Sequence, residues 1–260
     1  MAHREPFAFH PVDGVAYGLR APGERAERLK KWDLIDSMVL ATFRYDRQLG
    51  RADVEHFVTD FFNDARVRAA LPVCTGRGRW GTLPAPVTAV RMAQVPATRV
   101  RMDLFDRLFE AGVARRETGD VAKCFDTPLA DGVLASDRLR LALLDEGSDE
   151  YALFSVAERD ELLFRILRHL AVGGGLCQYD DSINAVLDSV KSAYRDLVRV
   201  HKSAQGQLEV SSWTYRVDAL EAAAGGDLWP RASPHNFAYV SVDHARRHVT
   251  FWSNAFLPLL

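Results

Sequence analysis

The residues best suited to do chemistry lie together at Cys177, Tyr179, Asp180 and Asp181. Two adjacent carboxyl groups can act as an acid and a base, and a cysteine at a helix N-terminus can have a lowered thiol pKa. No particular histidine can be assigned from the sequence as a base for Cys177. A helix is predicted to begin near Ser182, so we favour the interpretation that both aspartates cap this helix. An unrecognised enzymatic or small-molecule site at these residues is the alternative.

A metal site is the second chemistry to consider. His244 and His248 are four residues apart, a spacing that would place two ligands on one face of a helix. Strand patterns flank both histidines, so they are predicted to lie at a hairpin turn, where this geometry is lost. The cysteines Cys74, Cys124 and Cys177 are too far apart for a zinc site of the CxxC kind. We expect no metal and no other cofactor.

Catalytic motifs are missing from the sequence. The run GRGRWGT at residues 76–82 lacks the lysine of a phosphate-binding P-loop. The glycines at 173–175 follow a predicted helix and not a strand, so they are predicted to end that helix and not to bind a dinucleotide. The sequence also contains no GxSxG, no HExxH and no protein-kinase motifs. The motifs therefore give no indication of an enzyme.

The amino-acid composition excludes several classes of protein. The 33 Lys and Arg residues and 35 Asp and Glu residues give a formal net charge of -2, which does not favour binding to nucleic acid or a membrane surface. With 260 residues, of which 48% are hydrophobic, the chain can build a core without disulfides. No signal peptide is apparent, and no apolar run approaches the about 20 residues of a membrane helix. We expect a soluble intracellular protein.

Apolar residues recur at helical spacing in several stretches. Residues 1–23 are rich in Pro, Gly and charge and are predicted to form a loosely ordered arm, followed by a single domain over residues 24–260. Helices are predicted over Glu24–Phe43, from about Asp53, through Leu104–Phe109, over Arg138–Leu144 behind an Asp137 cap, after the capping-box pair Ser155 and Glu158, and from near Ser182.

Strand patterns occupy separate blocks of the chain. Short β-prone runs alternate with Gly and Pro between Leu71 and Met102, the last of them over Thr98–Met102. Separate blocks of helices and strands are typical of an α+β fold, here with a mainly antiparallel sheet. Two C-terminal hairpins are predicted, one from Leu197–His201 and Gln207–Val217, the other from Phe237–Val242 and His248–Trp252.

Two long runs resemble a known family. Residues 161–202 contain the run GGGLCQYDD and resemble the family of cilia- and flagella-associated protein 300. The run FAYVSVDHARRHVTF at residues 237–251 is similar to the same family's C-terminal segment. Shorter similarities, among them DFFND and VAKCFD, occur in the same order, so the resemblance covers most of the chain.

The resemblance implies a cytoplasmic and ciliary factor that is needed to assemble or deliver the outer and inner dynein arms of motile cilia. It implies no catalytic residues. The implied partners are dynein axonemal assembly factors, notably the kintoun-type co-chaperone, together with dynein-arm subunits and the intraflagellar transport machinery. We therefore expect a non-enzymatic adaptor in the cytoplasm and in the cilium or flagellum, including its axoneme. A structural subunit of the axoneme is a second alternative.

Turns on a stable scaffold commonly carry recognition, so two turns are predicted to contact partner proteins. The turn at residues 173–181 precedes a predicted helix, and the turn at residues 246–248 joins the last two strands. Arginines in the second turn could bind an acidic partner through bidentate contacts. The candidate protein-binding residues are Gly175, Gln178, Tyr179, Asp180, Arg246, Arg247 and His248.

Overall fold

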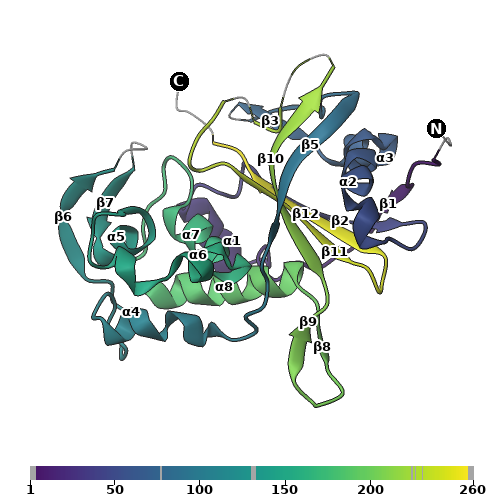
Figure 1. Cartoon of the computed structure of the whole chain (residues 1–260). Helices are drawn as coiled ribbons and strands as arrows, with labels where there is room; N and C mark the ends of the chain where they lie inside the picture. Colours follow the sequence, from purple (N-terminus) through teal and green to yellow (C-terminus); the bar gives the residue numbers. More distant parts are fainter. Residues whose placement is uncertain are drawn as a thin grey trace. The chain divides into compact units, whose positions relative to one another are not determined.

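The computed structural model describes residues 4–76, 78–129, 133–223, 225, 227–229 and 231–256 (Figure 1). Contacts between Cα atoms divide the chain into two compact units. The sheet unit comprises Met1–Ala16, Ile35–Val95 and Leu197–Leu260, and the helical unit comprises Tyr17–Leu34 and Pro96–Asp196. That residues 24–260 fold as one domain stays a prediction.

A six-stranded antiparallel sheet forms the sheet unit, in the order β1-β2-β12-β11-β10-β5. The predicted α+β class with a mainly antiparallel sheet is confirmed, and so is the last hairpin, in which Phe237 pairs with Asn254 and Asp243 with His248. The strands are β1 (Phe9–Pro11), β2 (Met38–Tyr45), β5 (Val87–Val95), β10 (Trp213–Ala222), β11 (Phe237–Asp243) and β12 (His248–Asn254).

Two small ribbons accompany this sheet. β3 (Val73–Gly76) pairs with β4 (Arg79–Gly81), and β8 (Val200–Lys202) pairs with β9 (Leu208–Val210). The other predicted C-terminal hairpin is present as β8–β9, but its strands differ from the prediction. The strand predicted over Leu197–His201 begins only at Val200, because Leu197 ends the helix α8 (Ile183–Leu197), and the strand predicted over Gln207–Val217 is divided into β9 and β10.

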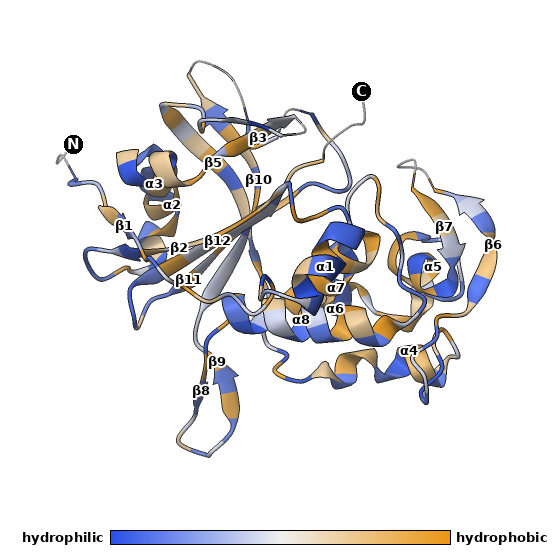
Figure 2. Cartoon of the chain, turned by 180° about the vertical axis from the view of Figure 1, so that it is seen from behind, coloured by the Kyte–Doolittle hydropathy of each residue, from blue (hydrophilic) through white to orange (hydrophobic). Residues whose placement is uncertain are grey.

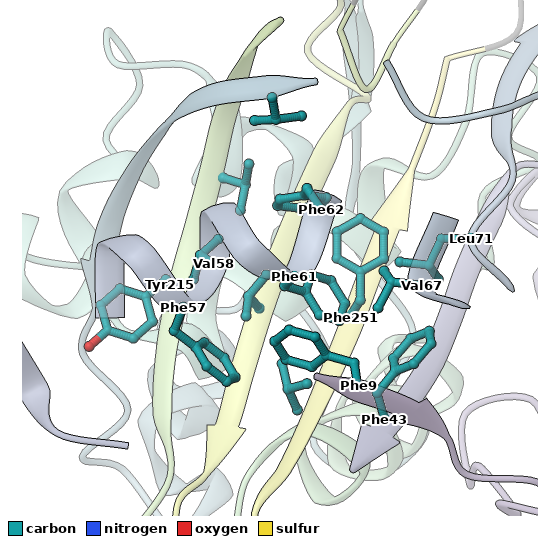
Figure 3. Packing of buried hydrophobic residues seen from close by; sticks show 14 of the residues in the cluster. Phe9, Phe43, Phe57, Val58, Phe61, Phe62, Val67, Leu71, Tyr215 and Phe251 are labelled. Carbon is teal, nitrogen blue, oxygen red and sulfur yellow. The ribbon is translucent and has the colours of Figure 1, made fainter. Parts of the chain in front are cut away.

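An aromatic layer joins helix α2 (Val54–Asn63) to the sheet. The Phe61 ring packs edge-on against Phe9 of β1 at 5.2 Å and Phe43 of β2 at 5.3 Å, and Phe62 packs against Phe251 of β12 at 5.7 Å (Figure 3). Edge-to-face aromatic pairs stabilise a core beyond the area that they bury. The predicted apolar stripe of this helix is confirmed, because all of its five members are buried. The helix follows a 3-10 turn at Arg51–Asp53 and precedes α3 (Ala65–Ala70).

The first fifty residues differ from their prediction. The helix predicted over Glu24–Phe43 ends early, as α1 (Glu24–Lys31), and the second half is strand β2. Asp33 has a φ of 54°, a left-handed conformation that does not continue a helix. Residues in the predicted loose arm also pack, since Phe7 and Phe9 are buried and β1 pairs with β2. The apolar residues on β2 are compatible with both the helical period of about 3.6 residues and the strand period of two. Pairing with β12 stabilises the strand.

Helices and one ribbon make up the helical unit. The helix predicted over Arg138–Leu144 is confirmed as α5, and the Asp137 carboxylate caps it by accepting a hydrogen bond from the Arg140 N–H at 3.0 Å. In Figure 2, hydrophilic and hydrophobic colours alternate along α8, as in an amphipathic helix. The other elements are η2 (Met102–Phe105), α4 (Asp106–Glu110), β6 (Lys123–Pro128), β7 (Leu134–Asp137), η3 (Tyr151–Leu153), α6 (Val156–Asp160), α7 (Leu162–Val172) and α8 (Ile183–Leu197).

The capping box is present but belongs to a shorter helix than predicted. The Ser155 hydroxyl and the Glu158 carboxylate cap α6 reciprocally, and this helix ends after one turn. Glu161 then adopts a non-helical ψ of 136°, and its carboxylate accepts a hydrogen bond from the Thr98 N–H at 3.0 Å. This bond also explains why the strand predicted over Thr98–Met102 is absent from the described residues: the Thr98 backbone binds a side chain.

None of the helices in the described ranges combines the length and the apolar character that crossing a membrane requires.

Glu158→Gln is expected to lower the free energy of unfolding by about 3 kcal/mol at pH 7. Burial opposes ionisation of Glu158, but bonds from the Ser155 N–H and the Arg107 guanidinium outweigh it and lower the pKa from 4.5 to about 2. The stabilisation is therefore complete above pH 4.5 and is lost as the pH falls through about 2. Denaturant unfolding of both proteins between pH 7 and pH 2.5 measures this difference. Glu110→Gln, an exposed control, should change little, and a difference that is constant with pH would contradict the assignment.

Candidate protein-binding surfaces

The connection from α7 to α8, residues 173–182, packs against the end of α1. The Gly174 N–H donates to the Trp32 carbonyl at 2.8 Å, and the Gln178 N–H donates to the Lys31 carbonyl at 2.8 Å. Because backbone groups of both segments bond to each other, the connection has a defined path and is not a loosely held loop.

Close contact explains why two of the three glycines at residues 173–175 have no side chain. A Cβ atom at Gly173 would lie 2.5 Å from the Cys177 Sγ, and one at Gly174 would lie 2.3 Å from the Asp33 carbonyl oxygen. Gly173 also has a φ of 65°, which ends α7. The prediction that these glycines end a helix is confirmed. Their further role, the close approach to α1, depends on a contact that the local sequence does not show.

Asp180 is held by the same end of α1. Its carboxylate accepts a hydrogen bond from the Trp32 indole Nε1 at 2.7 Å and forms an ion pair with Lys31. Trp32 is fully buried apart from 1% of its surface, so this bond satisfies a buried donor. Asp180 thus fixes the connection to α1, and the prediction that it caps α8 is wrong.

Asp181 also has a different role from the predicted cap. Its exposed carboxylate pairs with Lys123 of β6 at 2.6 Å, which lowers the pKa of Asp181. The residue that caps α8 is Ser182, whose hydroxyl accepts a hydrogen bond from the Asn184 N–H at 3.3 Å. A serine is as good a cap as an aspartate, so the type of residue alone could not decide between them.

Tyr179 lies against a buried arginine. The Arg140 guanidinium is centred 3.7 Å from the Tyr179 ring centroid, and Arg140 is only 1% exposed. Burial raises the pKa of the Tyr179 hydroxyl, although the Arg140 charge opposes this. Tyr179 therefore covers a buried cation, and a contact of this kind is strong where water is excluded.

The Cys177 thiol is unsuited to nucleophilic chemistry. Burial raises its pKa to about 12, and the neighbouring carboxylates of Asp180 and Asp33 add to this. A thiol with this pKa is protonated at neutral pH, and the thiolate is the reactive form. Cys177 packs beneath Gly173 as a small apolar group.

Within this connection, the predicted binding residues divide into two kinds. Gly175 and Gln178 are exposed, whereas Tyr179 and Asp180 are half-buried by the contacts described above. The exposed pair presents more surface to a partner than the half-buried pair does.

The turn between β11 and β12 carries the other predicted residues. Arg247 has a φ of 56°, its Nη1 donates to the Asp46 carbonyl at 2.8 Å, and its own carbonyl accepts from the Tyr45 N–H at 2.9 Å. Arg247 is therefore tied to the end of β2. Arg246 differs, because 60% of its side chain is exposed and its Nε lies 4.0 Å from the Asp243 carboxylate.

Basic residues surround His248 in this turn. Burial lowers the pKa of His248, and the charges of Arg246, Arg199 and Arg44 lower it further, against the effect of Asp243. Arg44 lies opposite His248 in the β2–β12 register, and Arg199 lies 3.5 Å from Asp243. The prediction missed Arg44 and Arg199, since the β2–β12 register brings Arg44 to this turn and a long-range ion pair with Asp243 brings Arg199. We call Arg44, Arg199 and Arg246 the arginine cluster of the sheet unit.

His244 stacks on an aromatic ring. Its ring lies 4.7 Å from that of Trp213 at an interplanar angle of 26°, and the Arg51 guanidinium lies 4.7 Å from the same indole. Across the described ranges, no three His, Cys, Asp or Glu residues are grouped so that they could hold a metal ion.

Gly174→Ala is expected to destabilise the protein by about 1–3 kcal/mol, because the added methyl group would meet backbone atoms of Asp33 that cannot rotate away. Thermal unfolding of the variant against the wild type measures this loss. Gly147→Ala is the matched control, since its Cβ would lie at an ordinary distance of 3.4 Å from the Asp145 carboxylate. Equal melting temperatures for Gly174→Ala and the wild type would show that the close approach is incorrect.

Comparison with known proteins identifies the family. A model of the family described as Cilia- and flagella-associated protein 300 matches residues 6–254. The chain is 36% identical over 254 residues to the protein of that name from Chlamydomonas reinhardtii, covering 96% of this chain and 98% of that protein. It is 31% identical to the one from Paramecium tetraurelia, covering 90% and 88%. No solved structure matches the chain. The chain therefore belongs to the family of cilia- and flagella-associated protein 300.

Proposed function

We propose that this chain is a non-enzymatic adaptor that acts in the assembly and transport of outer and inner dynein arms, in the cytoplasm and in the cilium or flagellum. The observation that carries the ciliary part is the family match over residues 6–254. The proposed partners are dynein axonemal assembly factors such as the kintoun-type co-chaperone, dynein-arm subunits and the intraflagellar transport machinery.

The chemistry of the α7–α8 connection supports binding over catalysis. The pKa of about 12 keeps the Cys177 thiol protonated, and the Asp180 carboxylate is engaged by Trp32 and Lys31. These groups are used to hold the connection against α1. The alternative, an enzymatic or small-molecule site near Cys177–Asp181, would require these contacts to break.

The arginine cluster of the sheet unit is the proposed surface for a partner. Arg44, Arg199 and Arg246 are exposed: Arg44 lies on β2, Arg246 lies in the turn between β11 and β12, and Arg199 directly precedes β8. Guanidinium groups bind carboxylates through charge-assisted, often bidentate hydrogen bonds. A partner with an acidic segment fits this surface, and complementary charge would also raise the rate of association.

Affinity capture of the tagged protein from the cytoplasm and from isolated cilia, read by mass spectrometry, tests the proposed function. Dynein chains together with assembly co-chaperones in the cytoplasmic fraction are the expected result. Stoichiometric retention in salt-washed axonemes would instead favour a structural subunit. The adaptor hypothesis fails if neither fraction yields a dynein-related partner, and ligand screening would then test the small-molecule alternative.

Arg246→Glu is expected to reduce capture of these partners several-fold while leaving the melting temperature unchanged, because its side chain is mostly exposed. Arg247→Glu should instead lower the melting temperature by about 2–4 °C, since it loses the hydrogen bond to the Asp46 carbonyl. Capture assays and thermal unfolding on the same preparations separate the two effects.

Arg91→Glu provides the control for charge reversal, because Arg91 is exposed on β5 at the opposite edge of the same sheet from β1. If Arg91→Glu reduces capture as much as Arg246→Glu, net charge and not the arginine cluster governs binding. If Arg246→Glu binds as well as the wild type, the proposed surface is wrong.

A further inference from the structure

The helical unit contains a polar cleft that the proposed function does not use. Its volume is about 290 Å³, and it lies among the end of α5, the segment that follows it, α6 and α7. These elements belong to one unit, and α5, α6 and α7 lie next to one another in Figure 1. The charged residues that line the cleft are Glu146, Arg159, Asp160, Arg165 and Arg168.

Helix geometry explains why the cationic residues converge. Phe164, Arg165, Arg168 and His169 all line the cleft, and their positions i, i+1, i+4 and i+5 lie on one side of α7. The break at Glu161 separates α6 from α7, and Arg159 of α6 lines the same cleft.

Arg159 is held in place by groups that do not neutralise its charge. Its Nη2 donates to the Ala142 carbonyl at 2.9 Å and to the Tyr151 carbonyl, and its guanidinium lies 3.3 Å from the centroid of the Tyr151 ring. Its Nε is buried and has no hydrogen-bond partner among the described residues. The buried Nε is closed to a ligand, but a fixed, partly desolvated cation beside the cleft favours an anion there.

The positive charges that line the cleft outnumber the negative charges that line it. Arg165 pairs with Asp160 at 2.7 Å, whereas no carboxylate of the described ranges forms an ion pair with Arg159 or Arg168. Burial lowers the pKa of Arg159, Tyr151 and Glu146 oppose this, and the Arg168 charge lowers the pKa further. Arg159 and Arg168 line the same cleft, and like charges so placed repel each other. Glu146 offsets part of this charge, so the five charged groups leave a net of one positive charge.

We propose that this cleft is an oxyanion site, in which Arg159 and Arg168 bind a phosphate monoester or a carboxylate carried by a side chain of a partner protein. The assignment of the anion to a partner rests on the proposed function, whereas the oxyanion chemistry rests on the cleft alone. An oxyanion between the two arginines would relieve their repulsion and accept several charge-assisted hydrogen bonds. The volume admits one such group with its side chain, which sets this cleft apart from an open basic surface.

The test uses the full chain and three peptides of one sequence, with phosphoserine, glutamate or serine at the central position, alongside inorganic phosphate. Binding is measured by isothermal titration calorimetry at fixed ionic strength. We expect inorganic phosphate and at least one of the two anionic peptides to bind, and the serine peptide not to bind. Arg168→Gln should weaken that binding by about tenfold or more, the loss of one charge-assisted contact.

Arg168→Gln is preferred to an Arg159 variant because, within the described ranges, the Arg168 side chain forms no hydrogen bond or ion pair that the fold would lose. Its melting temperature should therefore match that of the wild type. Arg195→Gln, on the exposed side of α8 in the same unit, removes the same charge elsewhere and should bind as the wild type does. Comparing the phosphoserine peptide with the glutamate peptide shows whether the cleft binds a phosphate monoester or a carboxylate.

Three results would overturn the oxyanion site: no binding of either anionic peptide or of phosphate, equal binding by Arg168→Gln, or equal weakening by Arg195→Gln. None of these results depends on dynein partners. Failure of the capture experiment with intact peptide binding would therefore count against the proposed function and leave the oxyanion site standing.

Discussion

The helical unit depends on one buried arginine. Arg140 of α5 donates to the Asp137 carboxylate at 2.8 Å and to the Ala171 carbonyl at 2.5 Å, and it lies against the Tyr179 ring. It thereby joins the N-terminal cap of α5, the last turn of α7 and the connection to α8. Removing one partner of such a pair leaves a buried charge uncompensated, at a cost of about 3–5 kcal/mol. Gly174, Gln178, Tyr179 and Asp180 take their positions from this contact or from contacts with the end of α1, whereas Asp181 is held by Lys123 of β6.

A different constraint organises the sheet unit. Aromatic rings of α2 meet rings from β1, β2 and β12, strands that are far apart in the sequence. The apolar stripe of the helix is local and was predictable, since its residues recur at i, i+3, i+4, i+7 and i+8. The strands that it covers were harder to predict, because β1 has three residues and acquires its structure from pairing with β2. The register of β12 against β2 also places Arg44 opposite His248.

Local chemistry decided which predictions succeeded. The Asp137 cap, the Ser155–Glu158 box and the glycine stop at Gly173 were predictable because each depends on residues within a few positions. The division of the predicted helix at Glu161 was not, because the carboxylate that holds it accepts a bond from Thr98, 63 residues away. The ribbon β6–β7 was missed for a related reason: its register is interrupted between Lys123 and Thr127 and gives little alternation.

The same distinction applies to the candidate binding residues. Sequence reasoning treated Arg246 and Arg247 alike, yet the left-handed φ of Arg247 and its bond to Asp46 make it part of the turn, whereas Arg246 is exposed. Asp180 was likewise assigned to a helix cap because its partner, Trp32, is 148 residues away. Contacts of this kind hold a turn in one conformation. Because less chain must be ordered on binding, a few exposed groups on such a turn can contribute more to affinity than the same groups on a mobile loop. The residues that proved structural are thus what would make their exposed neighbours effective in recognition.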